Sequence, residues 1–146
     1  MISEIERIGL IEARTEITDL VYRYALNIRG RTAAACMELF TEDGVFEVRQ
    51  GSFVDPGVSQ IRSQVVGRDA IGTYLNRAAA SETRMCPVIH NLLVSVNGHE
   101  AESNCVMIAH MWPSGQQMIG EYKDRYRYEN GWRFSVRSYT MFVQPA

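Results

Sequence analysis

The clearest pattern of polar and apolar residues lies near the carboxyl end, where two alternating runs flank Asn130 and Gly131. Both residues tolerate a positive φ, as a type I′ turn requires, so the runs are predicted to pair as antiparallel strands. Because side chains alternate between the two faces of a strand, one face of the first strand carries Tyr122, Asp124, Tyr126 and Tyr128. One face of the second strand carries Trp132, Phe134 and Val136. The hairpin therefore has an aromatic face to bury.

The first eighty residues show helical spacing instead. Ser3 followed by Glu6 is a capping-box pattern and predicts a short opening helix. Apolar residues at spacings of three and four predict a second helix, capped by Thr15 and continuing to Gly30. Residues 32–40 are predicted to form a third helix, and a last helix opens at residues 67–71.

The rest of the chain is typical of strands and turns. Residues 41–44 read as a polar turn and residues 50–57 as an irregular loop. Extended segments are predicted at residues 45–49, 61–66, 88–96, 101–112, 117–128 and 132–143. Helices first and a meander of long strands afterwards indicate one α+β domain over residues 1–146, with the helices packed on one face of a curved antiparallel sheet.

Composition narrows the function classes. The 146 residues carry 15 basic and 17 acidic side chains, a net charge of -2, which provides no basic field for nucleic acid. No apolar run is long enough to span a membrane, and the first residues are acidic where a secretory signal is basic, so we expect a soluble cytoplasmic protein. Three widely spaced cysteines suggest buried free thiols rather than disulfides or a zinc site.

Several short motifs, in a fixed order, extend over nearly the whole chain. They are R-Y-A at residues 23–25, L-F-T-E-D-G-V-F at 39–46, G-R-D-A-I at 67–71, I-H-N at 89–91, G-E-Y-K-D at 120–124 and N-G-W-R-F-x-x-R at 130–137. In this arrangement the chain resembles the SnoaL-like group of the nuclear-transport-factor-2-like cone fold, which includes scytalone dehydratase and hexachlorocyclohexane dehydrochlorinase. The cone supports many activities, and some of its members have none.

The resemblance implies a conical, mostly apolar pocket between the concave sheet and the helices, suited to a flat hydrophobic small molecule. It also implies a homodimer or homotrimer. In the dehydratase and the dehydrochlorinase, a histidine on a sheet strand takes a proton from carbon, and an aspartate near the end of the second helix orients it.

His90 matches the catalytic histidine of the resemblance, and alternation places it on the same side as Leu92 and Val94. Imidazole is the side chain whose ordinary pKa lies nearest to working pH, which is why histidine is a common choice for moving a proton in either direction. The alternative is a structural histidine bonded to a backbone carbonyl. The aspartate position falls on Arg29, with Asn27 nearby, and neither side chain is an anionic partner for a histidine. Arg29 either enters the pocket or meets solvent at the helix end.

Other acids and aromatic residues complete the expected pocket. Asp124 and Glu47 are alternative partners for the histidine. The resemblance implies that the hydroxyls of Tyr24 and Tyr122 bind or polarise a substrate oxygen, although Tyr24 also fits a core position. Phe53 and Trp112 are expected to help close the cavity. Methionines on the strands, Met111 among them, are expected to form an adaptable apolar wall or simple core.

Two further residues depend on strand alternation. The resemblance places a second pocket histidine near His110, but the count falls on Met111, and without a bulge His110 points outward. Arg137 matches an arginine that assists loss of an anionic leaving group in the dehydrochlorinase. Alternation, however, puts Arg137 on the face opposite to Trp132 and Phe134. On that face the alternative to a catalytic role is an ion pair on the outer surface.

These observations lead to a hypothesis and two alternatives. The hypothesis is a cofactor-independent lyase or isomerase that removes a proton from a hydrophobic cyclic molecule, with His90 as base and Tyr24 in support. The alternatives are a binding protein with the same pocket and no chemistry, or a scaffold subunit resembling the small subunit of aromatic-ring dioxygenases. His99 lies in a turn away from the other histidines, so no metal triad is predicted, and no motif calls for a cofactor or nucleotide.

Overall fold

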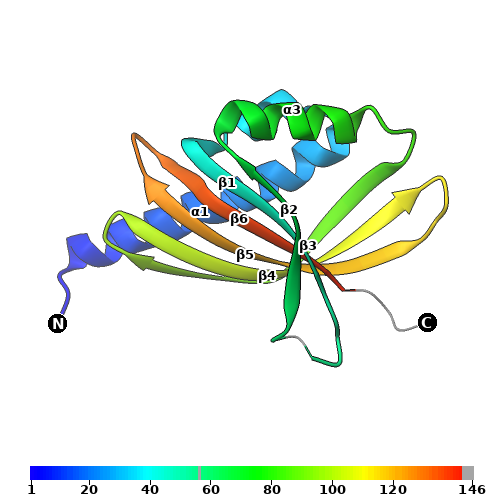
Figure 1. The fold of residues 1–146 in the computed structure, drawn as a ribbon. Coiled ribbons are helices and arrows are strands. Elements are labelled where there is room, and N and C mark those ends of the chain that lie inside the picture. Colours follow the sequence, from blue (N-terminus) through cyan, green and yellow to red (C-terminus); the bar gives the residue numbers. More distant parts are fainter. Residues whose placement is uncertain (56, 143–146) are drawn as a thin grey trace.

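The computed structural model describes residues 1–55 and 57–142. Three helices and six strands follow one another along the chain (Figure 1). The helices are α1 (Glu4–Gly30), α2 (Ala33–Met37) and α3 (Arg68–Ala79). The strands are β1 (Phe40–Gly51), β2 (Ser59–Val66), β3 (Arg84–Asn97), β4 (Glu100–Trp112), β5 (Gln117–Tyr128) and β6 (Trp132–Phe142).

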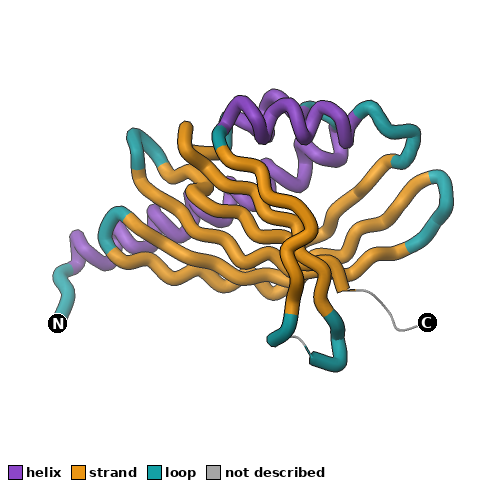
Figure 2. Tube along the Cα trace, viewed as in Figure 1, coloured by secondary structure: helices purple, strands orange, loops and turns teal. Residues whose placement is uncertain are grey.

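All six strands form one sheet in the order β2-β1-β6-β5-β4-β3. The pair β1 and β6 is parallel, and every other neighbouring pair is antiparallel. The sheet is curved and unclosed, and α1 and α3 lie on one side of it (Figures 1 and 2). Helix α1 packs on β3 and β6, and α3 packs on α2 and β1. This is the predicted α+β arrangement, in which the helices cover a single face.

The amino-terminal segment differs from the prediction, because one helix replaces two. The capping box at Ser3 and Glu6 is present, as predicted. Thr15, however, lies inside α1, where its hydroxyl donates a hydrogen bond of 2.9 Å to the carbonyl of Ile11. A threonine can serve as an N-cap or bond back to the preceding turn, so its identity does not mark a helix start. No proline interrupts residues 4–30, and the helix continues.

The polar segment at residues 41–44 is not a turn. It belongs to β1, which begins at Phe40, and α2 ends earlier than the helix predicted over residues 32–40. Backbone bonds hold this segment in the sheet: the amide of Phe134 donates to Leu39 at 2.9 Å, and the amide of Gly67 donates to Gly44 at 2.7 Å. Tertiary pairing thus overrides the local turn propensity.

The carboxyl-terminal hairpin forms as predicted. Asn130 and Gly131 have φ of 55° and 119°, and β5 pairs with β6 across them. Its aromatic face is buried, with Tyr126 and Phe134 almost fully covered. The predicted strand at 61–66 and the four long strands are also present. Pro56 and Val143, which the predicted loop and last strand included, lie outside the described residues.

Among the irregularities of the sheet, one β-bulge in β3 and one in β6 reverse the side-chain alternation near the candidate site. In β3, Asn91 has φ of 54°, and the register shifts between His90 and Leu93. In β6, Arg125 pairs with Val136 but Tyr126 pairs with Phe134, so Ser135 is the extra residue. Each bulge moves the residues beyond it to the opposite face from the one that simple alternation predicts.

Of the helices in the described ranges, none contains an apolar stretch long enough to cross a lipid bilayer.

A glycine in β5 makes room for an aromatic ring of the concave face. A Cβ added to Gly120 would lie 2.6 Å from the Thr140 carbonyl oxygen and 2.7 Å from the Tyr139 ring. We expect Gly120→Ala to lower the free energy of unfolding by about 1–3 kcal/mol, as overpacking does. Denaturant unfolding measures the loss.

Gly9 provides the matched control, because a Cβ there would meet nothing within 4 Å and the residue lies within α1. Gly9→Ala should stabilise the protein by about 0.5–1 kcal/mol, since alanine is the better helix former. Equal effects of the two substitutions would contradict the close approach at Gly120.

Candidate functional site

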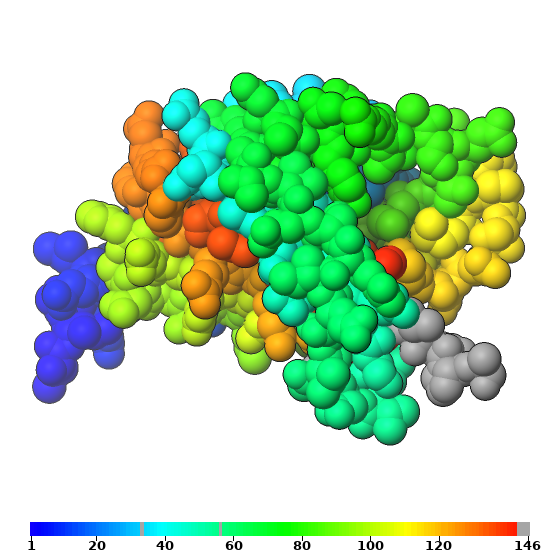
Figure 3. Space-filling model, viewed as in Figure 1, coloured from blue at the N-terminus to red at the C-terminus, as the bar shows by residue number. Residues whose placement is uncertain are grey.

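A cavity of about 420 Å³ lies between the concave sheet, the end of α1 and helix α3. Apolar and aromatic side chains predominate in its wall. The methionines and tyrosines in contact with it are Met85, Met111, Met118, Met141, Tyr24, Tyr74, Tyr122 and Tyr139. The surface is hollowed between the loop after α3 and the β4–β5 hairpin, drawn green and yellow in Figure 3. Volume and lining suit one small apolar molecule.

Two tyrosines bring polar atoms to this wall. Tyr24 comes from α1 and Tyr122 from β5, and their rings meet edge to face with centroids 6.3 Å apart. Among the described residues, neither hydroxyl takes part in a hydrogen bond. Burial raises the pKa of Tyr24 well above its ordinary value and that of Tyr122 to about 12. Both phenols therefore stay neutral and can donate a hydrogen bond to a ligand oxygen.

Arg137 lies directly against these tyrosines. Of the two readings of Arg137, a pocket residue or an ion pair on the outer surface, simple alternation favoured the outer face, but the bulge at Ser135 turns Arg137 inward. It is completely buried, and its guanidinium carbon lies 3.5 Å from the ring centre of Tyr122 and 4.1 Å from that of Tyr24. A third ring, Phe134, lies at 4.6 Å. The cation is thus held mainly by aromatic faces.

A buried carboxylate balances this charge. Asp124 lies opposite Arg137 in the sheet, with its Oδ1 3.7 Å from the arginine Nε. The Tyr126 hydroxyl donates to Asp124 at 3.5 Å and lies 2.6 Å from the Ser103 hydroxyl. The three guanidinium nitrogens have no hydrogen-bond partner among the described residues. The pair is therefore an ion pair with few supporting hydrogen bonds.

The two ionisable groups respond differently to burial. Burial raises the pKa of Asp124 to about 6, despite the opposing effect of Arg137. Burial also acts to lower the pKa of Arg137, but Asp124 and the surrounding tyrosines outweigh it and the pKa is raised. At neutral pH both groups are charged. The carboxylate balances Arg137 and does not contact a histidine.

His90 is not in the cavity, and the prediction that it projects into it is wrong. Its side chain is exposed, and it pairs with Val106 on the outer face of the sheet. The inward residue is its neighbour Ile89, which pairs with the fully buried Met107. The bulge at Asn91 is the reason, because alternation counted back from Leu92 assigns His90 to the wrong face.

His110 also lies on the outer face. Its ring is exposed, and its Nδ1 is 3.4 Å from the side-chain nitrogen of Gln117. Met111, the next residue, is in the cavity wall. This is the arrangement expected for β4 without a bulge.

At the end of α1, the residues that reach the cavity are Asn27 and Ile28. Arg29 is exposed on another side of the helix. Arg31 follows the helix in the left-handed conformation, with φ of 60°, and contacts the cavity. The spacing of the sequence motifs predicted Arg29 at the aspartate position of the pocket. The directions in which side chains leave the helix bring Asn27 and Arg31 to the cavity instead.

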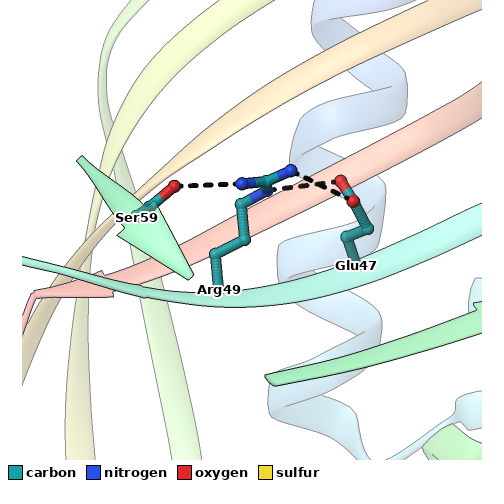
Figure 4. Close-up of polar contacts among 3 residues, drawn as sticks. All are labelled: Glu47, Arg49 and Ser59. Carbon is teal, nitrogen blue, oxygen red and sulfur yellow. Dashed lines mark hydrogen bonds and ion pairs between the residues drawn. The ribbon is translucent and has the colours of Figure 1, made fainter. Parts of the chain in front are cut away.

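The remaining predicted residues lie farther out. Phe53 is half exposed and stacks on Phe142 at 4.7 Å, away from the cavity wall. Trp112 is 63% exposed and borders a recess next to the cavity rather than the cavity itself. Glu47 bonds to Arg49, which also bonds to Ser59 (Figure 4). Glu47 is therefore paired with Arg49 rather than with a histidine.

Sequence reasoning missed several residues of this site. Tyr139 shares the inward face of β6 with Arg137 and Met141, and the bulge at Ser135 hid this orientation from simple alternation. Tyr74 and Arg31 reach the cavity from α3 and from the end of α1. The one available signal was the unusual Asp124 on the aromatic face of β5, which implied a buried cation nearby.

Within residues 1–55 and 57–142, no group of three or more histidine, cysteine or acidic side chains is arranged to hold a metal ion. The roles of Tyr24, Tyr122, Asn27 and Met111 in binding stay predictions, although all four line the cavity.

Residues 10–138 match the SnoaL-like domain family, so the chain belongs to that family. None of the curated proteins matches it.

Solved structures agree on the fold. An NTF2-like protein with a cystatin-like fold from Novosphingobium aromaticivorans is 25% identical, with a TM-score of 0.75 over 97% of this chain and 90% of the other. A protein from the same organism, provisionally named a scytalone dehydratase, is 21% identical, with a TM-score of 0.71 over 92% and 87%. A third, provisionally named the beta subunit of an aromatic-ring-hydroxylating dioxygenase, is 14% identical, with a TM-score of 0.76 over 94% of each chain.

Removing one member of the buried ion pair should be costly. We expect Asp124→Leu to lower the free energy of unfolding by about 3–5 kcal/mol, because it leaves Arg137 charged in the core with no polar partner at this position. The exposed pair of Asp43 and Arg127 is the control, and Asp43→Leu should cost at most about 1 kcal/mol. Urea unfolding measures both. The double variant Asp124→Leu with Arg137→Met should be more stable than Asp124→Leu alone, and equal losses for the two single leucine variants would contradict the assignment.

The raised pKa of Asp124 predicts a specific pH dependence. Between its ordinary value of 3.8 and about 6, the folded protein binds a proton that the unfolded chain does not. The contribution of Asp124 to stability is therefore highest below pH 4 and is lost as the pH rises to 6. Subtracting the stability profile of Asp124→Asn from that of the natural protein isolates this slope. A flat difference over that window would show that the carboxyl group titrates normally.

Proposed function

We propose that this protein binds a flat, largely apolar small molecule that carries at least one oxygen atom. The methionine side chains adapt to the apolar body of the ligand, since they are unbranched and polarisable. The neutral hydroxyls of Tyr24 and Tyr122 donate hydrogen bonds to the ligand oxygen. Arg137, stacked on both rings, strengthens these donors by withdrawing electron density from the phenols.

One observation favours binding over proton abstraction. Among the described residues in the cavity wall there is no carboxylate and no imidazole. His90 faces the opposite side of the sheet, and Asp124 is paired with Arg137 behind the wall. General base catalysis needs an acceptor within hydrogen-bond reach of the proton it removes, and the wall offers donors instead.

A dehydratase-like lyase or isomerase is the second candidate. The two tyrosine hydroxyls favour it, because donors aimed at a carbonyl oxygen also stabilise the enolate formed when a neighbouring carbon loses a proton. The fold shared with the protein provisionally named a scytalone dehydratase is consistent with it. In this candidate Tyr24 and Tyr122 are the catalytic residues, and the proton acceptor is water or a group of the substrate.

The assembly is also proposed rather than observed. A homodimer or homotrimer agrees with the resemblance of the sequence to cone-fold proteins. A scaffold role agrees with the fold shared with the dioxygenase beta subunit. Purification with a large iron-containing subunit would identify the scaffold role.

Binding and turnover are separated by following the mass of candidate ligands. We expect hydroxylated polycyclic and steroid-like compounds to bind to the purified protein with no change of mass over hours. His90→Ala should leave binding unchanged, because His90 is remote from the cavity. A change of mass that His90→Ala abolishes would overturn the proposal.

The two tyrosines should contribute to affinity through their hydroxyls alone. We expect Tyr24→Phe and Tyr122→Phe each to weaken binding of 2-naphthol by about 0.5–1.5 kcal/mol, the value of one hydrogen bond, with little effect on naphthalene. Tyr128→Phe is the control, since Tyr128 is 47% exposed and absent from the cavity wall. Calorimetric titration gives the affinities. Equal losses for both compounds would show that the rings matter and the hydroxyls do not.

A further inference from the structure

We propose that Arg31 and Arg84 form an anion-recognition site at the mouth of the cavity and select ligands whose apolar ring system ends in a carboxylate. The inference deepens the proposed binding function and rests on it. It assigns a polarity to the ligand, with the carboxylate at the mouth and the opposite end toward Tyr24 and Tyr122.

Both arginines line the cavity and a second, more open recess beside it. The recess has a volume of about 730 Å³ and is bordered by Glu82, Trp112 and Pro113 as well as the two arginines. Since the two spaces share Arg31 and Arg84, these side chains lie where the cavity meets the outside. A ligand bound among the methionines therefore passes both guanidinium groups.

Each arginine is held in place without a carboxylate partner among the described residues. Arg31 donates a hydrogen bond to the backbone carbonyl of Ser81, which fixes its side chain over the loop after α3. Arg84 begins β3 opposite Trp112, and its guanidinium carbon lies 5.8 Å from the Trp112 ring centre. Positioned cations with free donors are well suited to bind an incoming anion.

The charge balance around the mouth is uneven. Among the described residues, neither Arg31 nor Arg84 forms an ion pair, and the acid Glu82 borders only the outer recess. Three other arginines of the sheet, Arg49, Arg127 and Arg137, do have carboxylate partners, as Arg49 has in Glu47 (Figure 4). The cavity wall itself contains no acid among the described residues. Two uncompensated positive charges thus stand at the entrance to an apolar space.

A carboxylate fits this arrangement better than other groups. Its two oxygens match the parallel donors of a guanidinium group, and the apolar surroundings strengthen the attraction. An ammonium group would be repelled by both arginines. A neutral ligand would gain nothing from them, so the arginines act on specificity rather than on the apolar contacts.

The test compares 2-naphthoate with its methyl ester, which has the same ring system and no charge. We expect the natural protein to bind the acid more tightly than the ester. Arg31→Gln and Arg84→Gln should each weaken binding of 2-naphthoate by about fivefold, within the range of a partly exposed ion pair, and leave the ester within about twofold. Added salt should weaken the binding of 2-naphthoate and leave the binding of the ester unchanged.

Arg29→Gln is the matched control, because Arg29 belongs to the same helix end but is exposed and absent from the cavity wall. It should change neither affinity. The ester also tests whether a variant keeps its structure, because a variant with a distorted loop loses affinity for both compounds. Equal losses of affinity for the acid and the ester in Arg31→Gln and Arg84→Gln would overturn the anion site. Tight binding of the ester without preference for the acid would overturn this inference and leave the proposed function standing. Failure of both compounds to bind would overturn the two together.

Discussion

The site depends on a positive charge that has no access to water. Arg137 is completely buried between aromatic rings, and Asp124 balances it at 3.7 Å. Two strands must be in register for the pair to form, since Asp124 lies on β5 and Arg137 on β6. The same guanidinium contacts Tyr24 on α1, so a single side chain joins the long helix to the sheet at the base of the cavity. The positions of both tyrosine hydroxyls follow from that contact.

This interaction also defines what the cavity offers a ligand. Because Asp124 is occupied by Arg137, the wall keeps donors and loses the acceptor that proton abstraction requires. The geometry is then one of recognition: adaptable thioethers for the ring system, phenols for an oxygen, and arginines at the entrance. Membership of the SnoaL-like family is compatible with this reading, because the cone fold does not fix an activity.

Much of the fold was predictable from local patterns, and much of the site was not. The hairpin at Asn130 and Gly131 and the boundaries of β5 follow from turn chemistry and alternation. The orientation of His90 and Arg137 depends on bulges at Asn91 and Ser135, which neighbouring strands impose and no local pattern announces. One extra residue in each strand reverses the face that alternation indicates: His90, the expected base, points away from the pocket, and Arg137, for which alternation favoured the outer surface, is buried against Tyr24 and Tyr122. Tyr24 and Tyr122 were placed correctly because no irregularity separates them from their patterned neighbours.

The order of the strands has a further consequence for how the chain reaches this state. The last strand, β6, lies between β1 and β5, and its pairing with β1 joins segments nearly a hundred residues apart. Until residues 132–142 take their place, the sheet remains two separate pieces and the arginine that supports the cavity is missing. A binding-competent structure therefore requires that residues 132–142 have been synthesised and have paired with both neighbouring strands, and the entropic cost of closing so long a loop is met when β6 takes its place.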